Sequence, residues 1–158
     1  MDATATERRI GLEHAALRHE LSELLARARQ ALGAGPWPTA EADALVRYLT
    51  QQVLEQTDEE ERELFPLAAP GFHDRRVYRV VVDRLCTDHA ELRDAVREVI
   101  AAVGDRGRSG GRLLAALQTV EGRLLRHLAD EEALLFASTA QLGVEPAAGR
   151  WRRYAARE

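Results

Sequence analysis

The stretch HLADEEALLF at residues 127–136 places His127 and Glu131 four residues apart, so that both side chains lie on one face of a helix. A second stretch, QTDEEERELF at residues 56–65, aligns Gln56 with His127 and ends in the same Glu-Glu-x-x-Leu-Phe pattern. The chain therefore contains an internal repeat, with His-x-x-x-Glu in one copy and Gln-x-x-x-Glu in the other.

Three groups of helix-breaking residues divide the chain: GAGPWPT at 33–39, FPLAAPGFHD at 65–74 and GDRGRSGG at 104–111. The four intervening stretches, of roughly 25–30 residues, repeat their apolar residues at alternating steps of four and three. This period predicts an all-α protein, and short loops favour antiparallel neighbours. We therefore expect an up-down-up-down antiparallel four-helix bundle.

Two details of the helix ends follow from proline. Pro66 is predicted to end the second helix, because a proline in a helix interior removes a hydrogen bond and clashes with the preceding turn. The segment after Pro146, with Trp151 and Tyr154, could form a short fifth helix.

The composition fits a single soluble domain of 158 residues, 46% apolar and 30% charged. A net charge of −4 argues against nucleic acid as a partner. The single cysteine, Cys86, excludes an internal disulfide and fits a reducing compartment. No apolar run approaches the ~20 residues of a membrane span, and no hydrophobic signal segment is visible, so we expect a cytoplasmic location.

Polar residues interrupt the apolar faces of all four predicted helices. They are His14, Gln56, Glu60, His89, His127 and Glu131. A buried carboxylate without a partner costs several kcal/mol. With a rise of about 1.5 Å per residue, these positions lie at similar depth, roughly 10 Å from one end of an antiparallel bundle. The two glutamates and three imidazoles therefore predict a metal site in the bundle core.

Other polar residues have simpler interpretations. A single histidine on an apolar face is usually a hydrogen-bonded core residue, and only the convergence of three favours a metal. His19 lies off the apolar face and His73 lies in a loop, so both are expected to face solvent. Cys86 is interpreted as a buried thiol. A solvated acidic face is the simplest interpretation of Asp58, Glu59, Glu61, Asp130 and Glu132, and core packing that of Phe65 and Phe136.

Several other site chemistries are excluded by spacing. No histidine follows an acidic residue by three positions, as in ferritin-like di-iron bundles, and HExxH is absent. The sequence also contains no CxxC and no glycine-rich phosphate loop.

The ordered set of motifs resembles the hemerythrin-like, or HHE cation-binding, domain family. The matching words are EHAALR with His14, QTDEEERELFP with Gln56 and Glu60, DHAEL with His89, and HLADEEALLF with His127 and Glu131. The resemblance spans about residues 7–138. It implies a hemerythrin-like bundle over 1–144, followed by an arginine-rich tail at 145–158.

The resemblance implies a non-haem di-iron centre. One iron would take His14 and the helix-two residue, Gln56, and the other would take His89 and His127, with Glu60 and Glu131 bridging both. An oxo or hydroxo bridge would complete the centre and leave an open position for O2, NO or peroxide (H2O2).

The sequence departs from the family pattern at two positions. Gln56 stands where the family has histidine, and Arg93 stands four residues after His89, where oxygen-carrying hemerythrins have another histidine. Because glutamine is a weak, neutral ligand, we expect sensing, storage or redox chemistry rather than bulk O2 transport. A centre with only one iron occupied is the second form considered.

Two other functions remain open at this stage. A degenerate, metal-free bundle would serve as an interaction or scaffold module, with its histidines and glutamates hydrogen-bonded to one another. An iron enzyme that handles peroxide or nitric oxide would use the same residues. The sequence identifies no protein partner.

Overall fold

The computed structural model describes the backbone of residues 3–34, 37–69, 72–105 and 109–136, and every regular element in these ranges is helical. The prediction of an all-α protein is therefore confirmed. The first helix, α1, spans Ala3–Gly33, and the third long segment, α5, spans Arg75–Gly104. The proposed fifth helix and the tail at 145–158 lie outside the described residues.

The second and fourth long segments contain π-helical turns. The second runs through α2 (Thr39–Tyr48), η1 (Leu49–Leu54), α3 (Glu55–Glu59), η2 (Glu60–Leu64) and α4 (Phe65–Ala68). The fourth runs through α6 (Gly110–Glu131) and η4 (Glu132–Phe136). Both repeats thus change to π-helical hydrogen bonding at their Glu-Glu pair. Such turns are rare in proteins and often lie at functional sites.

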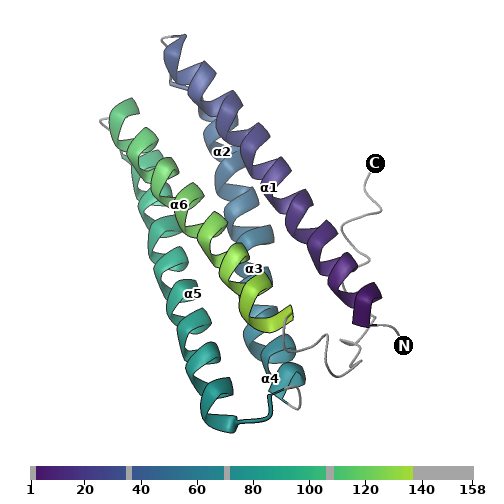
Figure 1. Ribbon diagram of the computed structural model, residues 1–158. Helices are drawn as coiled ribbons and strands as arrows, with labels where there is room; N and C mark the ends of the chain where they lie inside the picture. Colours follow the sequence, from purple (N-terminus) through teal and green to yellow (C-terminus); the bar gives the residue numbers. More distant parts are fainter. Residues whose placement is uncertain (1–2, 35–36, 70–71, 106–108, 137–158) are drawn as a thin grey trace.

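The long helices pack against one another: α1 packs against α2 and α6, and α5 packs against α6 and α2. In Figure 1 the purple start of α1, the label α4, the teal start of α5 and the yellow-green end of the fourth segment lie toward the same end of the molecule. Residues from four distant parts of the chain therefore meet there. No helix in the described ranges is both long and apolar enough to cross a membrane.

The core consists of two groups of buried apolar side chains. The larger group follows the predicted three-and-four spacing and includes Leu21, Leu25, Leu45, Leu49, Leu92, Val96, Leu113, Leu117 and Leu124. The smaller group contains Phe65, Ala68, Val81 and Leu85. Burying these side chains supplies most of the favourable free energy of folding, at about 25 cal/mol per Å² of apolar surface.

Local capping explains where α5 and α6 begin. The Asp74 carboxylate accepts a 2.7 Å hydrogen bond from the backbone N–H of Arg76, and the Ser109 hydroxyl accepts one of 3.3 Å from that of Arg112. Each cap satisfies an N–H that has no partner within its helix.

The prediction that Pro66 ends the second helix was wrong, because the helix continues through it to Ala68. The preceding π-helical turn ends at Leu64 and α4 begins at Phe65. Pro66 therefore stands in the first turn of α4, where the missing N–H is tolerated.

Two leucines of α1 provide a matched test of this core. Leu25 is fully buried and Leu12 is 66% exposed. We expect Leu25→Ala to lower the free energy of unfolding by about 2–5 kcal/mol, because it leaves a cavity, and Leu12→Ala to change it by less than about 0.5 kcal/mol. Urea unfolding of chelator-treated protein measures both, and equal effects would contradict the packing described here.

Candidate metal centre

Five of the six polar residues predicted on the helix faces meet in one buried cluster. His14 comes from α1, Glu60 from the start of η2, His89 from α5, and His127 and Glu131 from the end of α6. None of these five side chains is more than 2% exposed. We refer to these five residues as the His/Glu cluster.

Glu60 contacts two imidazoles. Its Oε2 lies 3.1 Å from Nε2 of His89 and 3.4 Å from Nε2 of His127, and the two Nε2 atoms are 3.2 Å apart. These three residues form the two-imidazole group, in which one ligand atom from each lies within 4.8 Å of the other two.

A second group contains only one imidazole. The Oε2 atom of Glu131 lies 3.4 Å from Nε2 of His14, and Glu60 completes a set of three ligand atoms within the same 4.8 Å limit. This is the one-imidazole group. Glu131 also approaches the other group, because its Oε2 lies 3.6 Å from Nε2 of His127. Glu60 belongs to both groups, so the five residues form one continuous site.

The two carboxylates have opposite electrostatic environments. Burial raises the pKa of Glu60, but contacts with His127 and His89 lower it by a larger amount. The pKa of Glu60 therefore lies below its ordinary value. Burial and the negative charge of Glu60 raise the pKa of Glu131 above its ordinary value, despite the opposing effect of His14. Two buried carboxylates therefore repel each other across the cluster.

The imidazoles compensate for only part of this charge. Burial lowers the pKa of His14, but Glu131 and Glu132 outweigh it, and the pKa of His14 lies above its ordinary value. The pKa of His89 is likewise raised, because Glu60 and Glu61 outweigh the effect of burial.

The cluster has the properties expected of a cation site. Within the described residues, Oε2 of Glu60 and both carboxylate oxygens of Glu131 are buried without a hydrogen bond of normal geometry. Buried polar atoms are seldom left in this state. A divalent cation would satisfy these oxygens and neutralise the repulsion between them. Three imidazoles with two carboxylates are a donor set that suits iron, manganese or zinc.

The sequence pattern of the family described as hemerythrin HHE cation binding domain matches residues 7–138 of the chain. The chain belongs to this family. No curated protein and no solved structure was found to match it. The resemblance inferred from the sequence motifs is thus confirmed over the segment that contains the whole His/Glu cluster.

Gln56, which replaces the histidine of the hemerythrin pattern, lies beside the cluster. It is half-buried, and its side-chain Nε2 donates a 2.8 Å hydrogen bond to Oε1 of Glu60. This bond leaves Oε2 of Glu60 as the oxygen that faces His89 and His127. A role for Gln56 as a metal ligand stays a prediction.

Two of the residues assigned to a solvated acidic face contact histidines of the His/Glu cluster. Oε1 of Glu132 lies 2.8 Å from Nδ1 of His14, and Oε1 of Glu61 lies 2.8 Å from Nδ1 of His89. Each glutamate is about one-third exposed (34% and 33%), and the interpretation as a purely solvated face was wrong for these two.

A signal for these contacts is present in the sequence. Glu61 and Glu132 occupy the same place in the internal repeat, directly after Glu60 and Glu131. The helical period alone assigns them to the surface, because successive residues on a helix point about 100° apart.

The surroundings of the cluster confirm several smaller predictions. The ring of Phe65 is buried and stacks on His89, with ring centroids 5.5 Å apart. His19 and His73 are exposed, as expected. Cys86, interpreted as a buried thiol, is only half-buried and packs beside the smaller core group. The side chain of Phe136 lies outside the described residues.

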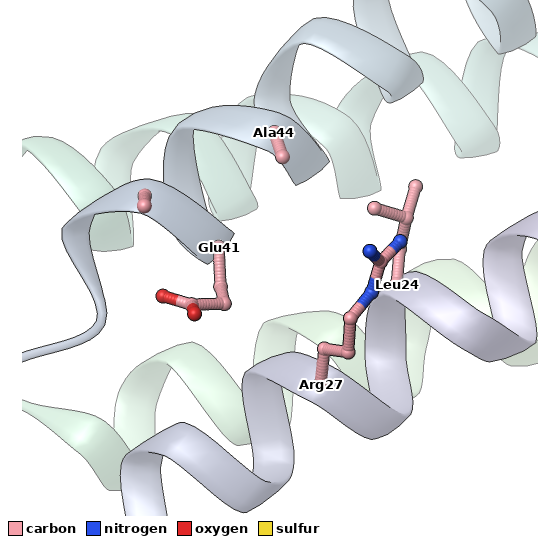
Figure 2. Close-up of a pocket in the computed structure, with 5 residues that line it drawn as sticks. Leu24, Arg27, Glu41 and Ala44 are labelled. Carbon is pink, nitrogen blue, oxygen red and sulfur yellow. The ribbon is translucent and has the colours of Figure 1, made fainter.

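An open hollow lies between α1 and α2 (Figure 2). It is lined by Leu24, Arg27, Ala40, Glu41 and Ala44. Arg27 follows His14 by 13 residues on one helix, a separation of about 20 Å at a rise of ~1.5 Å per residue. This hollow therefore gives no access to the His/Glu cluster.

The repulsion between the carboxylates predicts opposite effects on stability and on metal binding. Glu131→Gln removes one buried charge, so we expect the free energy of unfolding of metal-free protein to rise by about 1–3 kcal/mol. The same change should weaken metal binding, because it removes an anionic ligand.

The measurement for Glu131→Gln is urea unfolding in chelator, followed by titration of the folded protein with Zn(II). Glu55→Gln, an exposed change of the same charge on α3, is the control and should alter neither quantity. Loss of stability in the chelator-treated Glu131→Gln variant would contradict the electrostatic argument.

Proposed function

We propose that the protein holds iron in the His/Glu cluster and uses it for sensing, storage or redox chemistry. The observation that supports iron binding is the convergence of five buried ligand side chains with unsatisfied carboxylate oxygens. Membership of the HHE cation-binding family supports the same conclusion. When bound, iron would supply redox chemistry and an open position for O2, NO or peroxide.

The residues of this chain would prepare the site in three ways. The imidazoles and carboxylates would bind the cation, and Phe65 would exclude water from one face of His89. Gln56 would hold Glu60 by its Oε1 atom, so that Oε2 faces the imidazoles.

We further propose that the helices form an up-down-up-down antiparallel bundle in the cytoplasm. The common end shared by the starts of α1 and α5 supports the topology, and the single cysteine fits the location.

We propose that the two groups bind iron unequally, with a di-iron form at saturation. The two-imidazole group offers His89, His127 and Glu60, whereas the one-imidazole group offers His14 and two carboxylates. The first group would therefore hold iron more tightly and retain it when the concentration of free iron is low. This difference favours sensing or storage over reversible O2 transport.

Elemental analysis tests the proposal directly. Protein purified without added metal or chelator, and then loaded anaerobically with Fe(II), should contain between one and two irons per chain, with one released first on dialysis. Replacing Glu60 and Glu131 together by alanine should abolish iron binding. No iron after loading would instead support a metal-free scaffold, and full iron content in the double variant would place the metal elsewhere.

Gln56→His provides a gain-of-function test of the unequal groups. It restores the histidine of the family pattern and adds an imidazole beside the one-imidazole group. We expect the weaker iron to bind at least about tenfold more tightly, because an imidazole is a stronger ligand than a neutral amide. Competition with a chelator of known affinity measures this change.

Gln52→His on the same long segment, at a half-buried position one turn earlier, is the matched control for Gln56→His. It adds a histidine without placing it next to Glu60. An equal gain in both variants would show that the added imidazole acts outside the proposed site.

A further inference from the structure

The contacts of His14 and His89 with carboxylates are built in the same way. Glu132 accepts from Nδ1 of His14, and it also accepts a 2.8 Å hydrogen bond from Nη2 of Arg18. The arginine lies one helical turn after the histidine, so both reach the same carboxylate oxygen from one face of α1.

The second set repeats this arrangement on α5. Glu61 accepts from Nδ1 of His89 and accepts a 2.9 Å hydrogen bond from Nη2 of Arg93, again four residues after the histidine. Arg93 also donates to Asp58 at 2.7 Å. The segments EHAALR at 13–18 and DHAELR at 88–93 therefore carry the same pair, a histidine followed four residues later by an arginine.

The chemistry of these contacts fixes the direction of each ring. An ionised carboxylate oxygen has no proton and only accepts, so Nδ1 of each histidine must carry the hydrogen. With Nδ1–H donated outward, Nε2 points into the His/Glu cluster, where it lies 3.4 Å from Glu131 in the case of His14 and 3.1 Å from Glu60 in the case of His89. In the neutral ring Nε2 then has its lone pair available for a metal.

We propose that Glu132 and Glu61, held by Arg18 and Arg93, are positioning residues that aim Nε2 of His14 and His89 at the metal site. The proposal rests on the function proposed above and adds residues outside the ligand set. His127 is held differently, because its Nδ1 is buried without a hydrogen-bond partner among the described residues. The two arginine-held glutamates therefore act on one histidine of each group.

The size of the change in metal affinity distinguishes a role in orienting the histidines from a role in folding stability. The glutamates and arginines are about one-third exposed, and ion pairs at such positions contribute little to the free energy of folding. Partners that orient a metal-bound histidine, in contrast, typically change metal affinity by about 10–100-fold. We expect Glu132→Ala to weaken the ion of the one-imidazole group by this factor, and Glu61→Ala that of the two-imidazole group.

The test compares Glu132→Ala with Glu132→Gln, and Glu61→Ala with Glu61→Gln. The glutamine oxygen can still accept from Nδ1–H, so each glutamine variant should recover part of the affinity that the alanine variant loses. If the glutamates contributed only negative charge, the alanine and glutamine variants would bind Fe(II) equally weakly. Glu59→Gln is the control, because Glu59 makes no hydrogen bond or ion pair with a histidine in the described part of the chain.

A second readout needs no metal. In chelator-treated protein, NMR should detect slowly exchanging, downfield Nδ1 protons on His14 and His89, whether the rings are neutral or protonated. Glu132→Ala should remove the His14 signal alone, and Glu61→Ala the His89 signal alone. Arg18→Met should weaken Fe(II) binding in the parent protein and have no further effect in the Glu132→Ala background.

The two readouts separate this proposal from the proposed function. Unchanged proton signals and unchanged Fe(II) affinity in both alanine variants would overturn the positioning role. If the parent protein shows both proton signals but takes up no Fe(II), the iron function fails, while the orientation of the rings by the two glutamates stands.

Discussion

The burial of two carboxylates among three imidazoles is the constraint on which this structure depends. Glu60 and Glu131 lie in a helical core whose buried apolar side chains are mostly leucine, valine and alanine. Contacts with imidazoles compensate for the burial of the Glu60 charge. Glu131, in contrast, faces both the low-polarity interior and the charge of Glu60. The apolar remainder of the bundle must supply the free energy that keeps these charges buried, and a bound cation would relieve the repulsion.

The helical period was sufficient to predict the long helices and the residues that form the cluster. Polar residues on an otherwise apolar helix face stand out in a sequence, because their burial demands a partner. Glu61 and Glu132 could not be found in this way, since each lies beside a core residue and points about 100° away from it. Their partners come from other helices, and one of them is 118 residues away in the chain. The course of the helix through Pro66 was also missed, because helix periodicity does not reveal a π-helical turn.

The internal repeat explains both the symmetry and the asymmetry of the site. Each half of the chain supplies one histidine followed four residues later by an arginine, and one Glu-Glu pair at which the helix changes to π-helical bonding. At the ligand positions of the internal repeat, the two halves differ only in having Gln56 in one and His127 in the other. A single residue thus changes two similar halves into unequal binding groups, and in this structure it donates a hydrogen bond to the carboxylate that both groups share.

The exchange of partners between the two halves has a consequence for the order of folding. His14 on α1 is held by Glu132 at the start of η4, whereas His89 on α5 is held by Glu61 on η2. During synthesis, the contact of His89 becomes available once α5 has emerged, but His14 waits for nearly the entire described chain. Closing a loop costs more conformational entropy as the sequence separation grows, so the contact of His14, 118 residues from Glu132, is more costly to close than that of His89, 28 residues from Glu61. The site is therefore complete only after the last helix has packed against the others. A nascent or truncated chain without that helix would lack the one-imidazole group.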